Sequence, residues 1–222
     1  MIFEAGQRIV FIGDSITDCG RRDVRAPYGD GYVNLVRALV TARFPATPLT
    51  WVNRGVGGDT VRDLAARWER DAVGERPDWL FVMIGINDVW RAFAGRPDDA
   101  VPLDEYEATL RTLLRRAVEA TGCRLVLADP YLIEPDRADP QRAESDRYAA
   151  VVALLAAELG APHVATQRAF DEVLAVSPPT LWADDRVHPD LPGHAVIADA
   201  FLRVITSGNG GGSPLAGDAE TG

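Results

Sequence analysis

Four short groups of residues in this 222-residue chain combine a serine, glycines, an asparagine and an aspartate–histidine pair. A serine becomes nucleophilic when a histidine accepts its proton and a carboxylate orients that histidine. Backbone N–H groups and amide side chains stabilise the negative charge that forms on an attacked carbonyl. The four groups therefore hold the residue types that attack on an ester carbonyl requires. In chain order they are Gly13-Asp14-Ser15, Gly55-Val56-Gly57-Gly58-Asp59, Gly85-Ile86-Asn87-Asp88 and Asp185-Arg186-Val187-His188.

Ser15 follows a short apolar run, residues 8–12, that is typical of a buried strand. A serine at such a strand-to-helix turn presents its hydroxyl above the edge of the sheet, where a substrate can reach it. The structural alternative is that Ser15 only caps a helix, because serine is a good N-cap. On its own, Ser15 is thus both a candidate nucleophile and a candidate cap.

Gly58 and Asn87 follow the second and third apolar runs, and each also has a structural alternative. Gly58 lies in a glycine-rich turn where a backbone N–H could approach a substrate closely, although an ordinary tight turn has the same composition. The turn is not a dinucleotide fingerprint, because Thr60 occupies the place of the last glycine in GxGxxG. Asn87 could direct an amide N–H at a developing oxyanion or bond its own loop backbone.

His188 is the histidine best placed to act as a general base. Asp185 lies three residues earlier and can accept from the ring Nδ1–H, which leaves Nε2 toward the serine. Spacing selects Asp185, although Asp184 is directly adjacent. His194 falls in the first turns of the last helix with no acid three residues before it, and His163 opens a strand. The alternative for His188 is an ordinary loop histidine.

Apolar strands that alternate with amphipathic helices must position these groups. Such alternation predicts crossover connections and a parallel sheet covered on both faces, with ligands at the carboxyl ends of the strands. The predicted fold class is α/β, a three-layer α/β/α arrangement with a five-stranded parallel sheet. The expected strands are 8–12, 49–53, 79–84, 124–128 and 163–165. The expected helices with defined bounds are 32–44, 61–73, 144–159 and 191–205. Two further helices are expected, one that begins at a capping box at Asp104 and one that runs through Val173.

The composition of the chain argues against several classes of partner and cofactor. The net charge of −10 argues against nucleic acid and anionic membranes as partners, and no apolar run reaches the ~20 residues of a membrane span. All 23 basic residues are arginine, which excludes lysine-dependent cofactors and phosphate loops. With three histidines and two cysteines in unrelated contexts, we expect neither a metal nor a cofactor.

The chain organisation is simple. Its length predicts one domain, residues 1–206, and the composition of residues 207–222 predicts a flexible Gly/Ser-rich tail. The N-terminus lacks the basic start and long apolar core of a signal peptide, so we expect a cytoplasmic protein.

At the four groups the sequence resembles the SGNH hydrolases, also called GDSL-type esterases and lipases. The resemblance extends over essentially residues 6 to 205 and implies a flavodoxin-like SGNH hydrolase fold. It implies that Ser15, His188 and Asp185 form the catalytic triad. It also implies that the N–H groups of Ser15 and Gly58 and the side chain of Asn87 form the oxyanion hole.

Further stretches resemble the intracellular acetyl xylan esterases within this family, namely 11–20, 31–33, 83–91 and 104–110. This narrower resemblance implies a small acylated sugar ester as substrate, for instance acetylated xylo-oligosaccharides. Aromatic faces suit a sugar ring, and the candidate substrate-binding residues are Asp14, Tyr32, Trp90 and Trp182. Arg54 and Arg91 could orient a substrate, but we interpret them as part of a solvated face.

Two other functions fit the same residues. A general short-chain carboxylesterase, thioesterase or lysophospholipase would use the same triad with a wider acyl specificity. A non-catalytic flavodoxin-like binding module would use Ser15 and Asn87 as caps. Self-association as a homo-oligomer stays open beside catalysis, because relatives often self-associate.

Overall fold

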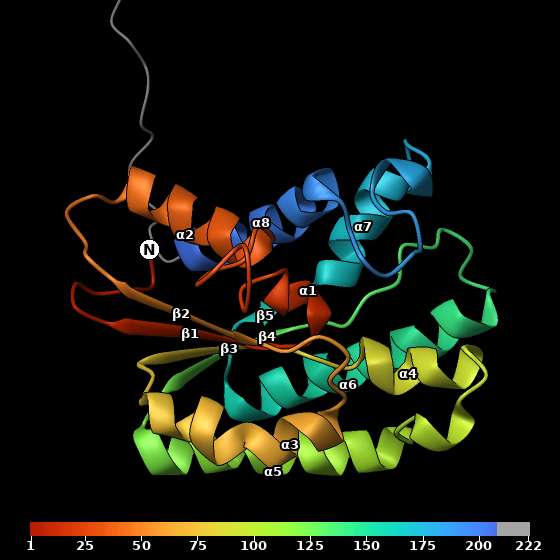
Figure 1. Ribbon diagram of the computed structural model, residues 1–222, viewed down its shortest axis with the longest axis horizontal. Coiled ribbons are helices and arrows are strands. Elements are labelled where there is room, and N and C mark those ends of the chain that lie inside the picture. The colour runs from red at the N-terminus through yellow and green to blue at the C-terminus, as the bar shows by residue number, and fades with distance from the viewer. Residues whose placement is uncertain (208–222) are drawn as a thin grey trace, which may run out of the picture.

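The computed structural model describes residues 1–207, and they form a five-stranded parallel sheet between two layers of helices (Figure 1). The predicted tail lies outside these described residues except for Ser207. The strand order is β2-β1-β3-β4-β5, which confirms the predicted three-layer α/β/α fold. The strands are β1 (Arg8–Gly13), β2 (Thr50–Gly55), β3 (Trp79–Met83), β4 (Arg124–Ala128) and β5 (His163–Val164).

Helices cover both faces of the sheet, as a parallel sheet requires. One face carries α2 (Tyr32–Arg43), α7 (Thr166–Leu174) and α8 (Leu191–Thr206). The other carries α3 (Val61–Asp71), α5 (Leu103–Thr121) and α6 (Pro140–Leu159), with α4 (Ile86–Phe93) beside α6 beyond the end of the sheet (Figure 1). The one-turn helix α1 (Ser15–Asp18) follows β1.

Successive residues of the central strands point into opposite core layers. In β1, Ile9 and Phe11 pack against the α2 and α8 side, whereas Val10 and Ile12 pack against the α3 and α5 side. The Phe11 ring stacks on Phe81 of β3 at 4.6 Å between centroids. A strand buried on both faces needs apolar residues at every position, and the short apolar runs of the sequence meet that need.

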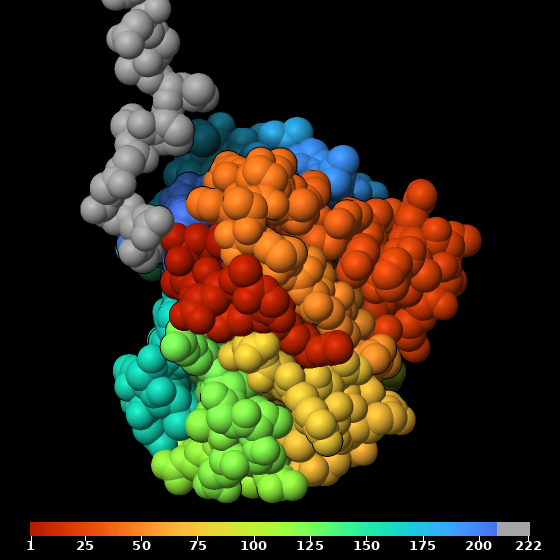
Figure 2. Space-filling model, turned by 90° about the vertical axis from the view of Figure 1, so that its left-hand side faces the viewer, coloured from red at the N-terminus to blue at the C-terminus, as the bar shows by residue number. Residues whose placement is uncertain are grey.

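The N-terminal segment closes the end of the sheet opposite to the site. Ile2 donates its N–H to the carbonyl of Ile205 in α8, and Phe3 packs edge-on against Trp51 and Trp79. Figure 2 shows this segment lying between the two helix layers. Because this end is filled, the opposite end, where the strands terminate in polar turns, is the one available for chemistry.

The strand register aligns the carboxyl ends of β1, β2 and β3, so the turns that follow these strands lie at the same height above the sheet. Gly13 of β1 aligns with Gly55 of β2 on one side and with Met83 of β3 on the other. In the strand order, β1 connects outward to β2 through α2, and β3 connects in the opposite direction to β4 through α5. The switch point, where open α/β sheets bind ligands, therefore lies between β1 and β3.

Three local predictions differ from the structure. The sequence pattern gave no helix at 86–93, yet α4 occupies it, so Asn87 lies in a helix instead of ending a strand. The capping box at Asp104 was wrong, because α5 begins at Leu103 after Pro102. Helix α6 starts earlier than predicted, since Asp139 caps it by accepting the N–H groups of Gln141 and Arg142, each at 3.0 Å.

Candidate active site

Ser15 is the first residue of α1 and stands at the carboxyl end of β1. The residue that caps this helix is Asp14, whose Oδ1 accepts the Ile16 N–H at 3.0 Å. With capping supplied by Asp14, the Ser15 hydroxyl is available for another partner. Its Oγ lies 3.0 Å from Nε2 of His188, the distance of a hydrogen bond.

His188 is held by Asp185, the aspartate that spacing selected. Its Nδ1 lies 2.6 Å from Oδ2 of Asp185, and its backbone N–H donates to Oδ1 at 2.7 Å. Partial burial disfavours the ionised carboxyl, but the N–H groups of His188 and Val187 and the His188 ring outweigh it, so the pKa of Asp185 lies below its ordinary value. An ionised Asp185 fixes the proton on Nδ1 and leaves Nε2 as the acceptor for Ser15.

The loop that carries Asp185 and His188 is anchored to the segment after β4. The bridge between Ala183 and Pro189 closes the loop, and the carbonyl of Arg186 accepts the Ile133 N–H at 2.8 Å. The Arg186 guanidinium reaches Glu134 at 3.1 Å in the same segment. These contacts fix a loop whose acid and base are both exposed.

Gly58 lies in a tight turn beside Ser15. The Asp59 N–H donates to the Val56 carbonyl at 3.3 Å, and Gly58 has a φ of +83° at the third position of this turn. That conformation is typical of a type II turn and favours glycine. A β-carbon built on Gly57 would lie 3.8 Å from Cβ of Ser15, so the turn runs alongside the nucleophile.

Asn87 is the second residue of α4 and is buried, with 5% exposure. One hydrogen of its Nδ2 goes to the carbonyl of Asp59 at 3.0 Å. This bond fixes which end of the amide is the nitrogen and leaves the second N–H for another acceptor. The structure therefore brings Ser15, the Gly58 turn, Asn87 and the Asp185–His188 pair to one edge of the sheet.

Two buried carboxyl groups lie beneath this edge. Burial raises the pKa of Asp14 to about 7, although the Ile16 N–H and His188 act in the opposite direction. Burial likewise raises the pKa of Asp88 to about 7, and Asp88 Oδ1 accepts the Val61 N–H at 2.9 Å. Both groups therefore hold a proton below neutral pH, unlike Asp185.

His194 lies in a separate hydrogen-bonded cluster. Its Nδ1 accepts the Tyr32 N–H at 3.2 Å, and its Nε2 lies 3.3 Å from Sγ of Cys19. Burial lowers the pKa of His194 to about 4, while burial and the Asp30 carboxylate raise the pKa of Cys19 to about 12. A neutral histidine and a protonated thiol tie α1 to α8 here.

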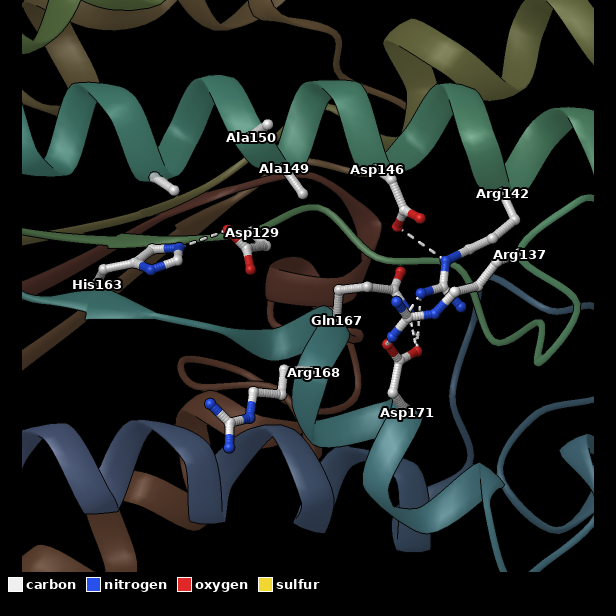
Figure 3. A pocket seen from close by; sticks show the side chains of 11 residues that line it. Asp129, Arg137, Arg142, Asp146, Ala149, Ala150, His163, Gln167, Arg168 and Asp171 are labelled. Carbon is white, nitrogen blue, oxygen red and sulfur yellow. Dashed lines mark hydrogen bonds and ion pairs between the residues drawn. The ribbon is translucent and has the colours of Figure 1, made fainter.

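A separate pocket of about 290 Å³ lies at the β5 edge of the sheet, between α6 and α7 (Figure 3). His163 lines it, with Nε2 2.5 Å from Oδ1 of Asp129. Its Arg142 guanidinium pairs with Asp146 and Asp171. These charges satisfy one another, which agrees with the structural interpretation of His163.

The candidate substrate-binding residues divide into two pairs. Asp14 and Tyr32 are each 1% exposed, and the Tyr32 hydroxyl bonds Thr17 at 2.9 Å, so both lie under the site. Trp90 and Trp182 are partly buried and keep exposed surface. Of the four candidates, only the two tryptophans therefore reach the surface.

Sequence reasoning missed Arg67 and misinterpreted Arg91, and both arginines bond the backbone of the site. Arg67 is buried and donates to the carbonyls of Gly13 and Arg54 at 2.9 and 2.7 Å. The interpretation of Arg91 as part of a solvated face was wrong, since its Nη2 donates to the Gly58 carbonyl at 2.6 Å. Helical spacing places Arg91 one turn after Asn87, a signal that only becomes readable once α4 is recognised as a helix.

Residues 1–207 contain neither a metal-ligand cluster nor a membrane-spanning helix. No group of three or more histidine, cysteine, aspartate or glutamate side chains there is arranged to hold a metal ion. None of the helices in that part of the chain is long and apolar enough to span a bilayer.

Residues 11–196 match the model of the GDSL-like lipase/acylhydrolase family, and the chain belongs to this family. An acetylxylan esterase of Geobacillus stearothermophilus is 45% identical over 208 residues, which are 90% of this chain and 94% of that protein. The crystal structure of that organism's acetylxylan esterase Axe2 superposes with a TM-score of 0.88, at 44% identity over 93% of this chain and 97% of that one. LAE5, an alpha/beta hydrolase enzyme from the metagenome of Lake Arreo, Spain, matches with a TM-score of 0.87, at 45% identity over 91% and 96% of the two chains.

The buried Asp88 gives a stability test. Its pKa is about 7 in the folded protein, against ~3.9 for an unfolded aspartate. Between these values the folded protein keeps a proton that the unfolded chain has released. The contribution of Asp88 to the free energy of unfolding therefore falls as pH rises from about 4 to about 7, by at most about 1.4 kcal/mol per pH unit.

Asp88→Asn cannot ionise and keeps an oxygen for the Val61 N–H. Its free energy of unfolding, relative to the unchanged protein, should rise across this window and level off above about pH 7. Urea unfolding of both proteins at several pH values measures the difference. A difference that stays constant with pH would show that Asp88 does not titrate there.

Proposed function

We propose that this protein is a serine esterase that removes acetyl groups from acetylated xylo-oligosaccharides or related acetylated sugars. The observation that carries the proposal is the continuous hydrogen-bond chain from Ser15 Oγ to His188 to Asp185, at 3.0 and 2.6 Å. The family relation and the similarity to acetylxylan esterases support the reaction class and the acetyl group. Solved structures of Axe2 include catalytic mutants in which a serine, a histidine or an aspartate is replaced by alanine, the same three residue types.

In the proposed mechanism, His188 Nε2 takes the proton of Ser15 as Oγ attacks the ester carbonyl. Asp185 accepts the Nδ1–H and stabilises the imidazolium that results. The tetrahedral intermediate collapses, the sugar hydroxyl leaves with the proton of His188, and acetyl-Ser15 remains. His188 then deprotonates a water molecule, which attacks the acetyl carbonyl and releases acetate and free Ser15.

The oxyanion of each intermediate is bound by the N–H groups of Ser15 and Gly58 and by the Asn87 Nδ2. Within residues 1–207, the Gly58 N–H has no hydrogen-bond partner, whereas the neighbouring Gly57 N–H is used by Asp18 at 3.2 Å. The Asn87 amide is oriented before substrate arrives by its bond to Asp59. Donors that are fixed in advance need no reorganisation when charge develops.

Exposure of the triad supports a bulky polar substrate with a small acyl group. The side chains of His188 and Asp185 are 52% and 54% exposed, so an ester on a large molecule can reach them. Trp90 and Trp182 are the proposed faces for the sugar ring. A general esterase or lysophospholipase would use the same triad but would hydrolyse long acyl chains as readily as acetyl groups.

Ser15→Ala should abolish acetate release from peracetylated xylobiose without unfolding the protein, because it removes the attacking oxygen and little else. Acetate release and circular dichroism on both proteins measure the two effects. 4-Nitrophenyl octanoate serves as the counter-substrate. A preference for octanoate would move the protein to the general esterase class, and full activity of Ser15→Ala would refute the serine mechanism.

Asn87→Ala should lower kcat by on the order of 10²–10³, the usual loss for one oxyanion donor, with a much smaller change in KM. Steady-state kinetics with an acetyl ester measure both constants. The expected split follows because the amide gains its full interaction only when the carbonyl oxygen becomes charged. Near-normal kcat in a folded Asn87→Ala protein would remove Asn87 from the proposed oxyanion hole.

A further inference from the structure

One exposed arginine lies beside the nucleophile and takes no part in the proposed mechanism. A β-carbon built on Gly57 would lie 3.8 Å from Cβ of Ser15 and 3.9 Å from Nη2 of Arg22. The two side chains thus flank the same glycine, and the sum of these two distances is the upper limit of their separation. The Arg22 side chain is 53% exposed, so its guanidinium lies at the rim of the site.

Arg22 is held in place before any ligand binds. Its Nε donates to Oδ2 of Asp18 at 2.9 Å, and its Nη2 lies 2.8 Å from the same oxygen. Asp18 is buried, and this oxygen also accepts the Gly57 N–H at 3.2 Å. The preceding residue, Arg21, donates to the Gly55 carbonyl at 2.7 Å, which ties the chain to the end of β2. Because the guanidinium is already restrained, little side-chain entropy remains to be lost on binding.

Asp18 occupies only one of the two edges through which the Arg22 guanidinium can form paired hydrogen bonds. The edge formed by Nε and Nη2 faces Asp18. The other edge, formed by Nη1 and the second N–H of Nη2, has no acceptor among residues 1–207. Two parallel N–H groups of this kind fit a pair of neighbouring acceptor oxygens. The free edge of Arg22 can therefore bind a substrate through two adjacent oxygens.

Both a carboxylate and a neutral sugar present such a pair of oxygens. The charge of Arg22 is already balanced by Asp18, and the net charge of −10 disfavours an anionic ligand. In a sugar ester, the sugar is bonded through oxygen to the carbonyl carbon that Ser15 attacks. The sugar must then lie next to Ser15, where Arg22 is a neighbour. The charge and the position together favour the neutral sugar.

We propose that Arg22 is a specificity-determining residue that binds two adjacent oxygens of the sugar part of the ester. This inference rests on the proposed function and deepens it. Arg22 contacts the sugar that leaves, not the acetyl group or the oxyanion. Its removal therefore weakens the binding of acetylated sugars and leaves an acetyl ester without a sugar unaffected.

The test measures kcat and KM of Arg22→Met on peracetylated xylobiose and on 4-nitrophenyl acetate, which has no sugar. We expect kcat/KM for the sugar ester to fall about 10- to 100-fold, mainly through a higher KM, the size expected for lost hydrogen bonds to a charged group. Both constants for 4-nitrophenyl acetate should stay within about twofold of the unchanged protein, because the triad and the oxyanion donors are intact.

Two further variants sharpen this comparison. Arg22→Lys keeps the charge but not the planar fork, so it should lose about 3- to 10-fold in kcat/KM on the sugar ester. Arg116→Met is the matched control, since Arg116 is 51% exposed and pairs with one carboxylate, Glu69, on the surface between α3 and α5. It should match the unchanged protein on both substrates. Thermal unfolding identifies any variant that does not fold, and Arg22→Lys carries the comparison if Arg22→Met does not.

A purely structural role gives a different pattern. If Arg22 only supports Asp18 and the Gly57 N–H, its loss should lower kcat equally on both substrates, and that result would overturn the proposal. Unchanged kinetics on both substrates would overturn it as well. Peracetylated glucose and peracetylated glucuronic acid form a second pair that differs by one carboxylate. A preference for the glucuronic acid ester that Arg22→Met abolishes would assign the free edge to a carboxylate instead of a neutral sugar.

The unchanged protein separates this inference from the proposed function. If it hydrolyses neither peracetylated xylobiose nor 4-nitrophenyl acetate, the esterase function itself fails. If it hydrolyses only 4-nitrophenyl acetate, the proposed sugar substrate fails. The role of Arg22 is decided by the variants once the unchanged protein hydrolyses both esters.

Discussion

The guanidinium of Arg67 is the contact on which the geometry of the site depends. It is buried, and it donates to the Gly13 carbonyl at the end of β1, the Arg54 carbonyl near the end of β2 and the Asp59 carboxylate in the glycine turn. One rigid group thus links the chain segments that carry Ser15 and Gly58. A buried charge is tolerated only when it is paired, and Asp59 at 2.6 Å supplies that pairing.

Burial decides which acids of the site are charged. Asp14 and Asp88 lie under the sheet edge with pKa values of about 7, while Asp185 lies at the surface with its pKa lowered by the N–H groups around it. The same separation applies to the histidines, since burial lowers the pKa of His194 to about 4 and ties its ring to backbone and thiol. The exposed, carboxylate-bound His188 is the proposed base. One residue type therefore serves structure or catalysis according to its environment.

Features set by local sequence were predictable. The strands followed from apolar runs, and Asp185–His188 followed from a spacing of three residues, which one loop can close. The role of Arg67 was not predictable, because its bond to Gly13 joins residues 54 apart in the chain. Helix α4 was missed because it has only eight residues and begins just after the apolar run 79–84, and the reversal at Gly85, with φ of +132°, is invisible to periodicity. Missing that helix also hid the position of Arg91, which is one turn after Asn87 on α4.

The segment 85–91 acts as one structural unit, in which several side chains of α4, and not Asn87 alone, contact the neighbouring turn. Positions 87, 88 and 91 lie on one side of α4, since Arg91 follows Asn87 by four residues and Asp88 by three. In the proposed mechanism Asn87 offers its amide to the oxyanion from that side, while Asp88 and Arg91 bond the backbone of the neighbouring turn. The other two proposed oxyanion donors, the Gly58 N–H and the Asn87 Nδ2, are thereby both held by α4. The distance between them stays fixed even if the exposed loop that carries Asp185 and His188 moves. One turn of α4 therefore keeps Asn87 and the turn that carries Gly58 in fixed positions relative to each other.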